Sequence, residues 1–430
     1  MFNSLAVLNT QTRDEQMQIR MIVAFVTLAF LTTSLQAENW PRFRGPNADG
    51  LHDSAKLPTQ WNEDENVVWK AATPGKGHSS PVIWGHQIWM GTALNNGHDL
   101  HAICFNRDGK LIHNVKLFHI EKLEASNTLN SFASPTPVIE EGTVYLYFGT
   151  YGVAALDTKS GRVKWLRQDI KLNHQEGPGS SPILYKNLLI FHCDGYDVQH
   201  ITALDKKSGS TVWKTTRSLD LSGVGNHARK AFVTPVVRKV NGKDLLVSPA
   251  AQGCYAYDPN TGEEIWRIAC AGFSAVPQPV FSGNLTYIIP DFGRPEIWAV
   301  DISGKGVLTE ENVKWKYNTA CPSTPSLILK DGLIYFVADK TGVASCITAD
   351  TGELVWRERI GGSFSTSPVA TKDHIYFLDR NGTTTVVSLG RKFNIVSRNT
   401  LADGCMASPA IADNKLFVRT ATHLYCLGTR

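Results

Sequence analysis

The sequence predicts an all-β protein, an eight-bladed β-propeller of four-stranded antiparallel blades. Three observations lead to this prediction: a short proline motif occurs eight times, a turn-and-tryptophan motif recurs between the prolines, and the composition favours strands and tight turns. The 430 residues include 35 Gly and 11 Trp, while only 19% are charged. Helices prefer Ala, Leu, Glu and Lys, so this mixture is typical of short strands joined by turns.

The first repeat is a small or polar residue followed by a proline and an apolar pair, as in Ser80-Pro81-Val82-Ile83. Successive copies lie 41–56 residues apart, and a period of this size indicates a stacked or circular repeat architecture. Proline is tolerated at the first residue of a strand, so each copy predicts the start of the innermost strand of a blade. The eight prolines are Pro81, Pro137, Pro182, Pro235, Pro279, Pro325 (in Thr324-Pro325-Ser326-Leu327), Pro368 and Pro409.

The second repeat is a turn followed by a strand that ends on tryptophan, as in Asp157, Gly161 and Trp165. Asp caps its own backbone and Gly takes the positive φ that the turn requires. Because the pattern recurs at one structural position, we interpret it as packing between blades and not as a catalytic or sugar-binding site. The other copies are Asp205, Gly209 and Trp213; Asp258, Gly262 and Trp266; Gly352 and Trp356, without the Asp; and Trp315, after an insertion that follows Asp301.

The eighth repeat has no tryptophan strand of its own, whereas a spare one stands at residues 66–70 and contains Trp69. We expect this N-terminal strand to complete the last blade, which closes the ring and removes its free edges. Two copies are degenerate: His113 stands near the tryptophan position in blade one, and Ile395 or Val396 in blade seven. The predicted domains are a signal peptide at 1–37, a lead-in segment at 38–65 and the propeller at 66–430.

The N-terminus has the pattern of an export signal. Arg20 precedes an apolar run at 21–31, and Ala37 offers a small residue for cleavage. Residues 1–16 show none of these features, so translation could begin at Met17 or Met21. The alternative is an uncut signal anchor, although the run is short for a membrane span. We expect a periplasmic or secreted protein whose mature chain has no membrane span.

Composition and motifs exclude several classes of function. A net charge of +4 leaves no electrostatic footprint for nucleic acid. None of the eight cysteines is adjacent to another or forms a C-x-x-C pair, and most fit small buried residues on strands. His98, Asp99 and His101 could bind a metal, but on a strand their side chains alternate faces, so no metal site is predicted.

The spacing A-x-D-x-x-T-G-x-x-x-W at residues 256–266, with its preceding proline strand, resembles the pyrroloquinoline-quinone (PQQ)-type propeller family. The opening W-P-R-F-R-G-P at 40–46 is similar to the lead-in of exported bacterial members, and the resemblance extends over residues 40–430. The family includes quinoprotein dehydrogenases and non-catalytic propellers, of which the BamB-like accessory proteins of outer-membrane assembly are the best known. The resemblance therefore implies the fold and leaves two kinds of function open.

The dehydrogenases of this family carry two adjacent cysteines against the quinone and a Ca²⁺ held by acidic and amide side chains. This chain has no adjacent cysteines and no matching acidic constellation. The resemblance thus favours an exported, monomeric, non-catalytic scaffold without a cofactor, which binds another cell-envelope protein or a small ligand. The alternative is a PQQ-dependent dehydrogenase of alcohols or sugars with PQQ and Ca²⁺ as cofactors.

A propeller of this kind presents its most variable loops on one face, which we call the top face: the loops before each proline strand and those joining the second and third strands. The longest connections, 117–130 and 217–232, lie on it. Binding residues concentrate in long loops on a rigid scaffold, although ordinary solvated loop residues are the alternative. Carbohydrate binding is a third possibility, for which only Phe132, Phe273, Phe292 and Phe364 are placed. The candidate residues for an anion or ligand site are His78, His174, Glu176, His227, Arg229 and Lys230.

Overall fold

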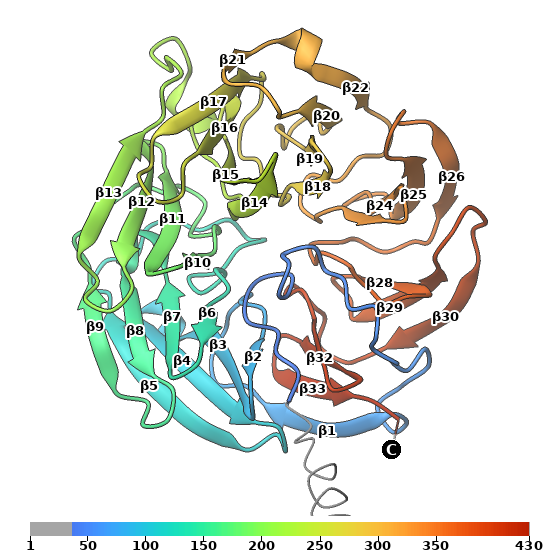
Figure 1. The fold of residues 1–430 in the computed structure, drawn as a ribbon. Helices are drawn as coiled ribbons and strands as arrows, with labels where there is room; N and C mark the ends of the chain where they lie inside the picture. Colours follow the sequence, from blue (N-terminus) through green and yellow to red (C-terminus); the bar gives the residue numbers. More distant parts are fainter. Residues whose placement is uncertain (1–36, 430) are drawn as a thin grey trace, which may run out of the picture. The chain divides into compact units, whose positions relative to one another are not determined.

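The computed structural model describes residues 37–429, and the predicted signal sequence up to residue 36 lies outside the described residues. Eight sheets stand in a ring about a common centre, which we call the channel, and each contains four antiparallel strands, so the all-β eight-bladed prediction is confirmed (Figure 1). The strands of blades one to four are β2 (Val82–Trp84), β3 (Gln87–Leu94), β4 (Asp99–Asn106), β5 (Leu111–His119); β6 (Val138–Glu140), β7 (Thr143–Tyr147), β8 (Val153–Asp157), β9 (Val163–Arg167); β10 (Ile183–Tyr185), β11 (Leu188–Asp194), β12 (Gln199–Asp205), β13 (Thr211–Thr216); and β14 (Val236–Val240), β15 (Lys243–Ala250), β16 (Gly253–Tyr257), β17 (Glu264–Ala269).

Blades five to seven repeat this order, and short 3-10 turns punctuate the loops of the described chain. The strands are β18 (Val280–Ser282), β19 (Leu285–Ile288), β20 (Ile297–Asp301), β22 (Val313–Tyr317); β23 (Ile328–Lys330), β24 (Leu333–Val337), β25 (Val343–Thr348), β26 (Leu354–Arg359); and β27 (Val369–Ala370), β28 (His374–Leu378), β29 (Thr383–Ser388), β30 (Ile395–Thr400). The turns are η1 (Asn95–Gly97), η2 (Gly149–Tyr151), η3 (Asn226–Ala228) and η4 (Glu310–Asn312). No helix within residues 37–429 combines the length and the apolar character that a membrane crossing requires.

Blade eight closes the ring from both ends of the propeller. Its inner strands are β31 (Ala410–Ala412), β32 (Lys415–Arg419) and β33 (His423–Leu427), and its outer strand is the N-terminal β1 (Val67–Ala72). Strand β1 pairs antiparallel with β33, which places blue beside red in Figure 1. The prediction that an N-terminal strand completes the last blade is confirmed.

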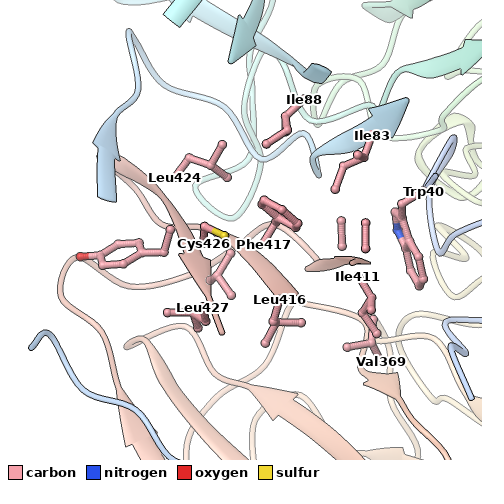
Figure 2. Packing of buried hydrophobic residues seen from close by; sticks show 14 of the residues in the cluster. Trp40, Ile83, Ile88, Val369, Ile411, Leu416, Phe417, Leu424, Cys426 and Leu427 are labelled. Carbon is pink, nitrogen blue, oxygen red and sulfur yellow. The ribbon is translucent and has the colours of Figure 1, made fainter. Parts of the chain in front are cut away.

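The sheets pack face to face through buried side chains. Figure 2 shows the cluster around blade eight, in which Ile411 and Phe417 meet Ile83 of blade one and Val369 of blade seven. Trp40 of the lead-in segment joins the same cluster and is 1% exposed. The lead-in is therefore part of the packed propeller.

The recurring tryptophans dock onto the turn of the next blade. Trp165 donates its indole N–H to the Lys206 carbonyl at 3.1 Å, and its ring lies against Gly209, where an added Cβ would come within 2.8 Å. Gly209 has a φ of +75°, so the turn requires glycine for its backbone as well. The same indole-to-carbonyl bond to the next blade is made by Trp69, Trp213, Trp315 and Trp356.

Blade four differs from this pattern. The insertion after Asp301 forms β21 (Gly306–Leu308), which pairs in parallel with β17 and gives the blade a fifth strand. The insertion covers Trp266, which is 0% exposed and packs in one cluster with Leu308. The exposed edge of blade four is consequently β21 instead of the tryptophan strand.

The degenerate positions need one correction. In blade one His113 lies against Gly161 of blade two, as the sequence predicts. In blade seven the prediction of Ile395 or Val396 at the tryptophan position is wrong. A β-bulge shifts the pairing of β30 with β29, so Ser397 occupies the position that tryptophan has in the other blades. The missing ring is supplied by Trp61 of the lead-in, which stacks on Tyr376 at 6.3 Å.

The start of blade six is also displaced from its prediction. Strand β23 begins at Ile328, two residues after Ser326, in the same way that β27 begins two residues after Ser367. Ser326 therefore takes the place predicted for Thr324, and Leu327 replaces the proline. Thr324 instead donates its hydroxyl to Asp339 Oδ2 at 2.5 Å.

Candidate functional site

A ring of hydroxyl side chains links neighbouring blades around the channel. The Ser80 N–H donates to Thr136 Oγ1 at 3.1 Å, and the Thr136 N–H donates to Ser181 Oγ at 2.9 Å. The bond recurs across the channel, from the Ser367 N–H to Ser408 Oγ at 2.8 Å. The residue before the inner-strand proline, or Ser326 in blade six, thus takes part in a bond between neighbouring blades at six of the eight junctions. The hydroxyl residues of this ring, called the hydroxyl ring, are Ser80, Thr136, Ser181, Thr234, Ser326, Ser367 and Ser408, while blade five has Gln278 at this position and contributes its backbone N–H.

A pocket of about 550 Å³ extends from the hydroxyl ring into the top-face loops. Phe232, Phe273 and Phe292 line it from blades four and five, and Met406 lines it from the loop before blade eight. Pockets of this size and apolar character hold small ligands or single side chains of a partner. The top face therefore has a preformed concave site at the centre of the ring.

The polar wall of the pocket lies over blades two and three, and its side chains form hydrogen bonds and an ion pair with one another. Lys230 Nζ donates to Gln175 Oε1 at 2.6 Å and lies 3.3 Å from Glu176 Oε1. Asn127 Nδ2 donates to the other Glu176 oxygen at 2.9 Å, and Asn130 Nδ2 donates to the Glu176 carbonyl at 2.8 Å. These bonds join the two long loops, 117–130 and 217–232, to the loop between them.

Four of the six predicted site residues line this pocket: His78, Glu176, His227 and Lys230. His78 is neutral at pH 7, because burial and the nearby Arg419 charge lower its pKa to about 4. His227 is exposed at the mouth, where its ring meets Phe273 edge-on at 6.4 Å.

The other two predicted residues support the loops from behind. His174 is 6% exposed, and its Nε2 accepts the Thr150 N–H at 2.8 Å, so the ring braces two loops against each other. Burial lowers the pKa of His174 to about 4. Arg229 donates its Nε–H to the Val224 carbonyl at 2.8 Å and ties its own loop together.

The lead-in segment passes near the centre of the ring, between the inner strands of blades one and seven, as the dark blue trace in Figure 1 shows. Trp40 forms a bridge with Ile83 of blade one, and Leu51 forms one with Ala370 of blade seven. Between them Phe43 reaches the pocket lining. The N-terminal segment therefore forms part of the pocket.

In the same segment lies Arg44, which is 2% exposed. Its Nη2 donates to the Leu327 carbonyl at 2.5 Å and to the Asp49 carbonyl at 2.6 Å. Burial lowers its pKa to about 10, so the guanidinium is charged at pH 7. The bond to Leu327 fastens the lead-in to blade six, and the bond to Asp49 lies within the lead-in itself.

Sequence reasoning missed Lys340, Phe43 and Met406, which line the pocket from three distant parts of the chain. Lys340 lies in the turn between β24 and β25, a top-face connection that was recognisable from the strand order. Of the four aromatics considered for carbohydrate binding, Phe273 and Phe292 reach the pocket, while Phe364 is buried and Phe132 packs on Tyr151.

The donor set of the pocket does not suit a quinone with its calcium ion. Calcium takes six to eight oxygen ligands, whereas Glu176 is the one carboxylate of the lining and is already bound to Lys230 and Asn127. Residues 37–429 contain no group of three or more His, Cys, Asp or Glu side chains placed to hold a metal. The eight cysteines all lie in this described range, where each is buried and free.

Comparison with known proteins agrees with this architecture. A family model described as outer membrane protein assembly factor BamB matches residues 121–237, 197–325 and 307–401. This chain belongs to the PQQ-like β-propeller family. The family resemblance read from residues 256–266 is therefore confirmed.

Relatives within the PQQ-like family differ in kind. BamB from Moranella endobia is 24% identical over 216 residues, which is 47% of this chain and 53% of that protein. The quinohemoprotein alcohol dehydrogenase ADH-IIG from Pseudomonas putida is 26% identical over 144 residues, 31% of this chain and 19% of that enzyme. The chain thus spans about half the length of the first of these relatives and about a fifth of the second.

Among solved structures, a europium-containing methanol dehydrogenase superposes with a TM-score of 0.67 at 11% identity, covering 88% of this chain and 89% of the enzyme. At that identity the likeness concerns the fold alone. Function has to be argued from the pocket.

Proposed function

We propose that this chain is an exported, non-catalytic propeller of the bacterial cell envelope that captures a partner protein or a small ligand in its top-face pocket. The observation that carries the proposal is the pocket itself: it is concave, largely apolar, and its carboxylate is already paired. The BamB description of the matching family model supports a binding role in envelope assembly.

The alternative is a PQQ-dependent dehydrogenase, which the alcohol dehydrogenase relative favours. Such an enzyme must polarise a quinone with a cation and place a base for the substrate proton. In this pocket Glu176 would have to leave Lys230 and Asn127 before it could serve as that base or as a metal ligand. We therefore assign no reaction step to the pocket.

The first test separates the two functions. Purified protein supplied with PQQ and Ca²⁺ should show no dye-linked oxidation of alcohols or sugars. Stoichiometric PQQ binding with turnover would reject the non-catalytic role.

The second test asks whether capture depends on the pocket. Phe292 is 37% exposed and lines the pocket, so Phe292→Ser should fold normally and weaken the retention of envelope partners that the native protein captures. Val212→Ser is the matched control, because Val212 is 50% exposed on β13, away from the pocket lining. Equal capture by native protein and Phe292→Ser would refute the pocket as the binding surface.

A further inference from the structure

Several hydroxyl groups of the pocket are free to donate a hydrogen bond. Thr136, Ser181 and Thr234 each accept a backbone N–H within the hydroxyl ring. Within residues 37–429 their own O–H groups donate no hydrogen bond, and the same holds for Ser408. Because a neighbouring N–H already points at each oxygen, each hydroxyl hydrogen is left to turn toward the pocket.

Several acceptors of the pocket already have donors within the protein. Gln175 Oε1 accepts from Lys230, and both Glu176 carboxylate oxygens have partners. Asn130 Oδ1 accepts a hydrogen bond from the Ser134 hydroxyl at 2.5 Å. The ligand that fits is rich in acceptors.

The pocket also carries one positive charge in excess. Its charged lining residues are Lys230, Lys340 and Glu176, and Lys230 is paired with Glu176. Lys340 is exposed and has no hydrogen-bond or acidic partner within the described chain. A ligand with a single negative charge would balance the site.

The remaining lining residues are apolar and favour a ligand that has a large apolar group, which we call its body. Phe273 and Phe292 stand on the blade-five side, and Leu129, which is 45% exposed, faces the pocket from the loop before blade two. Exposed apolar side chains gathered around one hollow mark a recognition site. A volume of about 550 Å³ accommodates an aromatic group together with a small polar head.

We propose that the pocket binds a monocarboxylate with an aromatic or bulky apolar body. The ring hydroxyls hold the carboxylate within the field of Lys340, and the body lies against Phe273 and Phe292. This assignment rests on the binding role proposed above and names its ligand chemistry. A free organic acid and the C-terminal residue of a protein chain share that chemistry.

The test is calorimetric titration of the purified protein with N-acetyl-L-phenylalanine and with its uncharged amide. The acid should bind, and the amide should bind about tenfold more weakly, since hydrogen bonds to a charged group are the stronger ones. Lys340→Gln should weaken binding of the acid by a similar factor and leave the amide unchanged. Lys372→Gln, an exposed lysine outside the pocket, should change neither affinity.

A pentapeptide ending in phenylalanine, as free acid and as amide, separates the two sources. Tighter binding of the free-acid peptide than of the small acid supports a protein C-terminus, and binding of the small acid alone supports an organic acid. Equal affinity for acid and amide, or no binding of either, would overturn the assignment. In that case a loss of partner capture in Phe292→Ser would still leave the binding function standing.

Discussion

At the scale of single residues, this propeller depends on side chains that meet a partner from the adjacent blade. Trp165 fits Gly209 because the turn glycine has no Cβ to collide with the indole. Thr136 and Ser181 join blades because a short hydroxyl can reach the next backbone N–H. The same residue types would contribute little on an isolated blade, since each contact needs a neighbour.

His174 gives a residue-scale prediction about acid stability. Its folded-state pKa of about 4 lies below the value of 6.5 for a solvated histidine, so below pH 6.5 the unfolded chain binds a proton that the folded chain refuses. Stability should fall as the pH decreases from about 6.5 to 4. Each pKa unit corresponds to roughly 1.4 kcal/mol, so His174 contributes on the order of 3 kcal/mol to this loss.

The variant His174→Gln tests this, since its amide oxygen can still accept the Thr150 N–H. Guanidinium unfolding at pH 7 and pH 4.5 should show a smaller loss in the variant than in the native protein. Some loss should persist, because burial also lowers the pKa of His78 and His200 to about 4. If the native protein and the variant lost the same unfolding free energy between pH 7 and pH 4.5, His174 would not contribute to acid destabilisation.

At the scale of elements, the lead-in segment contributes to both the pocket and the packing of blade seven, although its backbone is irregular. It forms bridges with blades one and seven, contributes Phe43 to the pocket and supplies blade seven with the aromatic ring that its own outer strand lacks. Trp61 is 3% exposed, and its backbone N–H donates to Asn399 Oδ1 at 3.0 Å. Blade seven is therefore completed by a segment more than 300 residues away in sequence.

Trp61→Ala should consequently cost as much as losing a tryptophan within a blade, roughly 3–5 kcal/mol for a buried large aromatic. Guanidinium unfolding would measure it beside Trp165→Ala as a comparison. Asp64→Ala is the control, because its exposed side chain lies in the same segment and surface changes usually stay within about 0.5 kcal/mol. A Trp61→Ala variant as stable as the control would show that blade seven does not need the ring.

At the scale of the whole molecule, stability depends on closing the ring. Strand β1 covers the edge of β33, and Trp69 packs against Phe417 at 6.1 Å and donates to the Arg107 carbonyl of blade one. Each blade rests on two neighbours, so an open ring would expose one sheet edge and two apolar faces. The N-terminal strand thus stabilises residues from both ends of the chain.

Two truncations distinguish ring closure from the lead-in. A chain starting at Asn66 keeps β1 and loses the lead-in, whereas one starting at Pro74 loses both. The shorter chain should melt well below the longer one and lose a further 3 kcal/mol or more, roughly the value of one large aromatic, with lower soluble yield. Equal melting temperatures in calorimetry would show that β1 is dispensable for closure.

The sequence by itself determined the number of blades, their order and the strand that closes the ring. Pro81 and its counterparts, Gly161 and Trp165 carry this information because each constrains its own backbone or recurs at a constant distance. The fold could be predicted as far as the repeats are regular. The prediction failed where the repeat is irregular: at Thr324, because the strand starts two residues later than expected, and at Ser397, because a bulge shifts the register.

Only the tertiary structure decided which top-face residues form the pocket. His174 and Glu176 are two residues apart, yet one side chain is buried behind the loop and the other lines the pocket, because an irregular loop has no period that reveals direction. His78 and Lys340 meet in one pocket although more than 200 residues separate them. Ring closure brings them together, and that proximity is a property of the assembled blades and not of any local pattern.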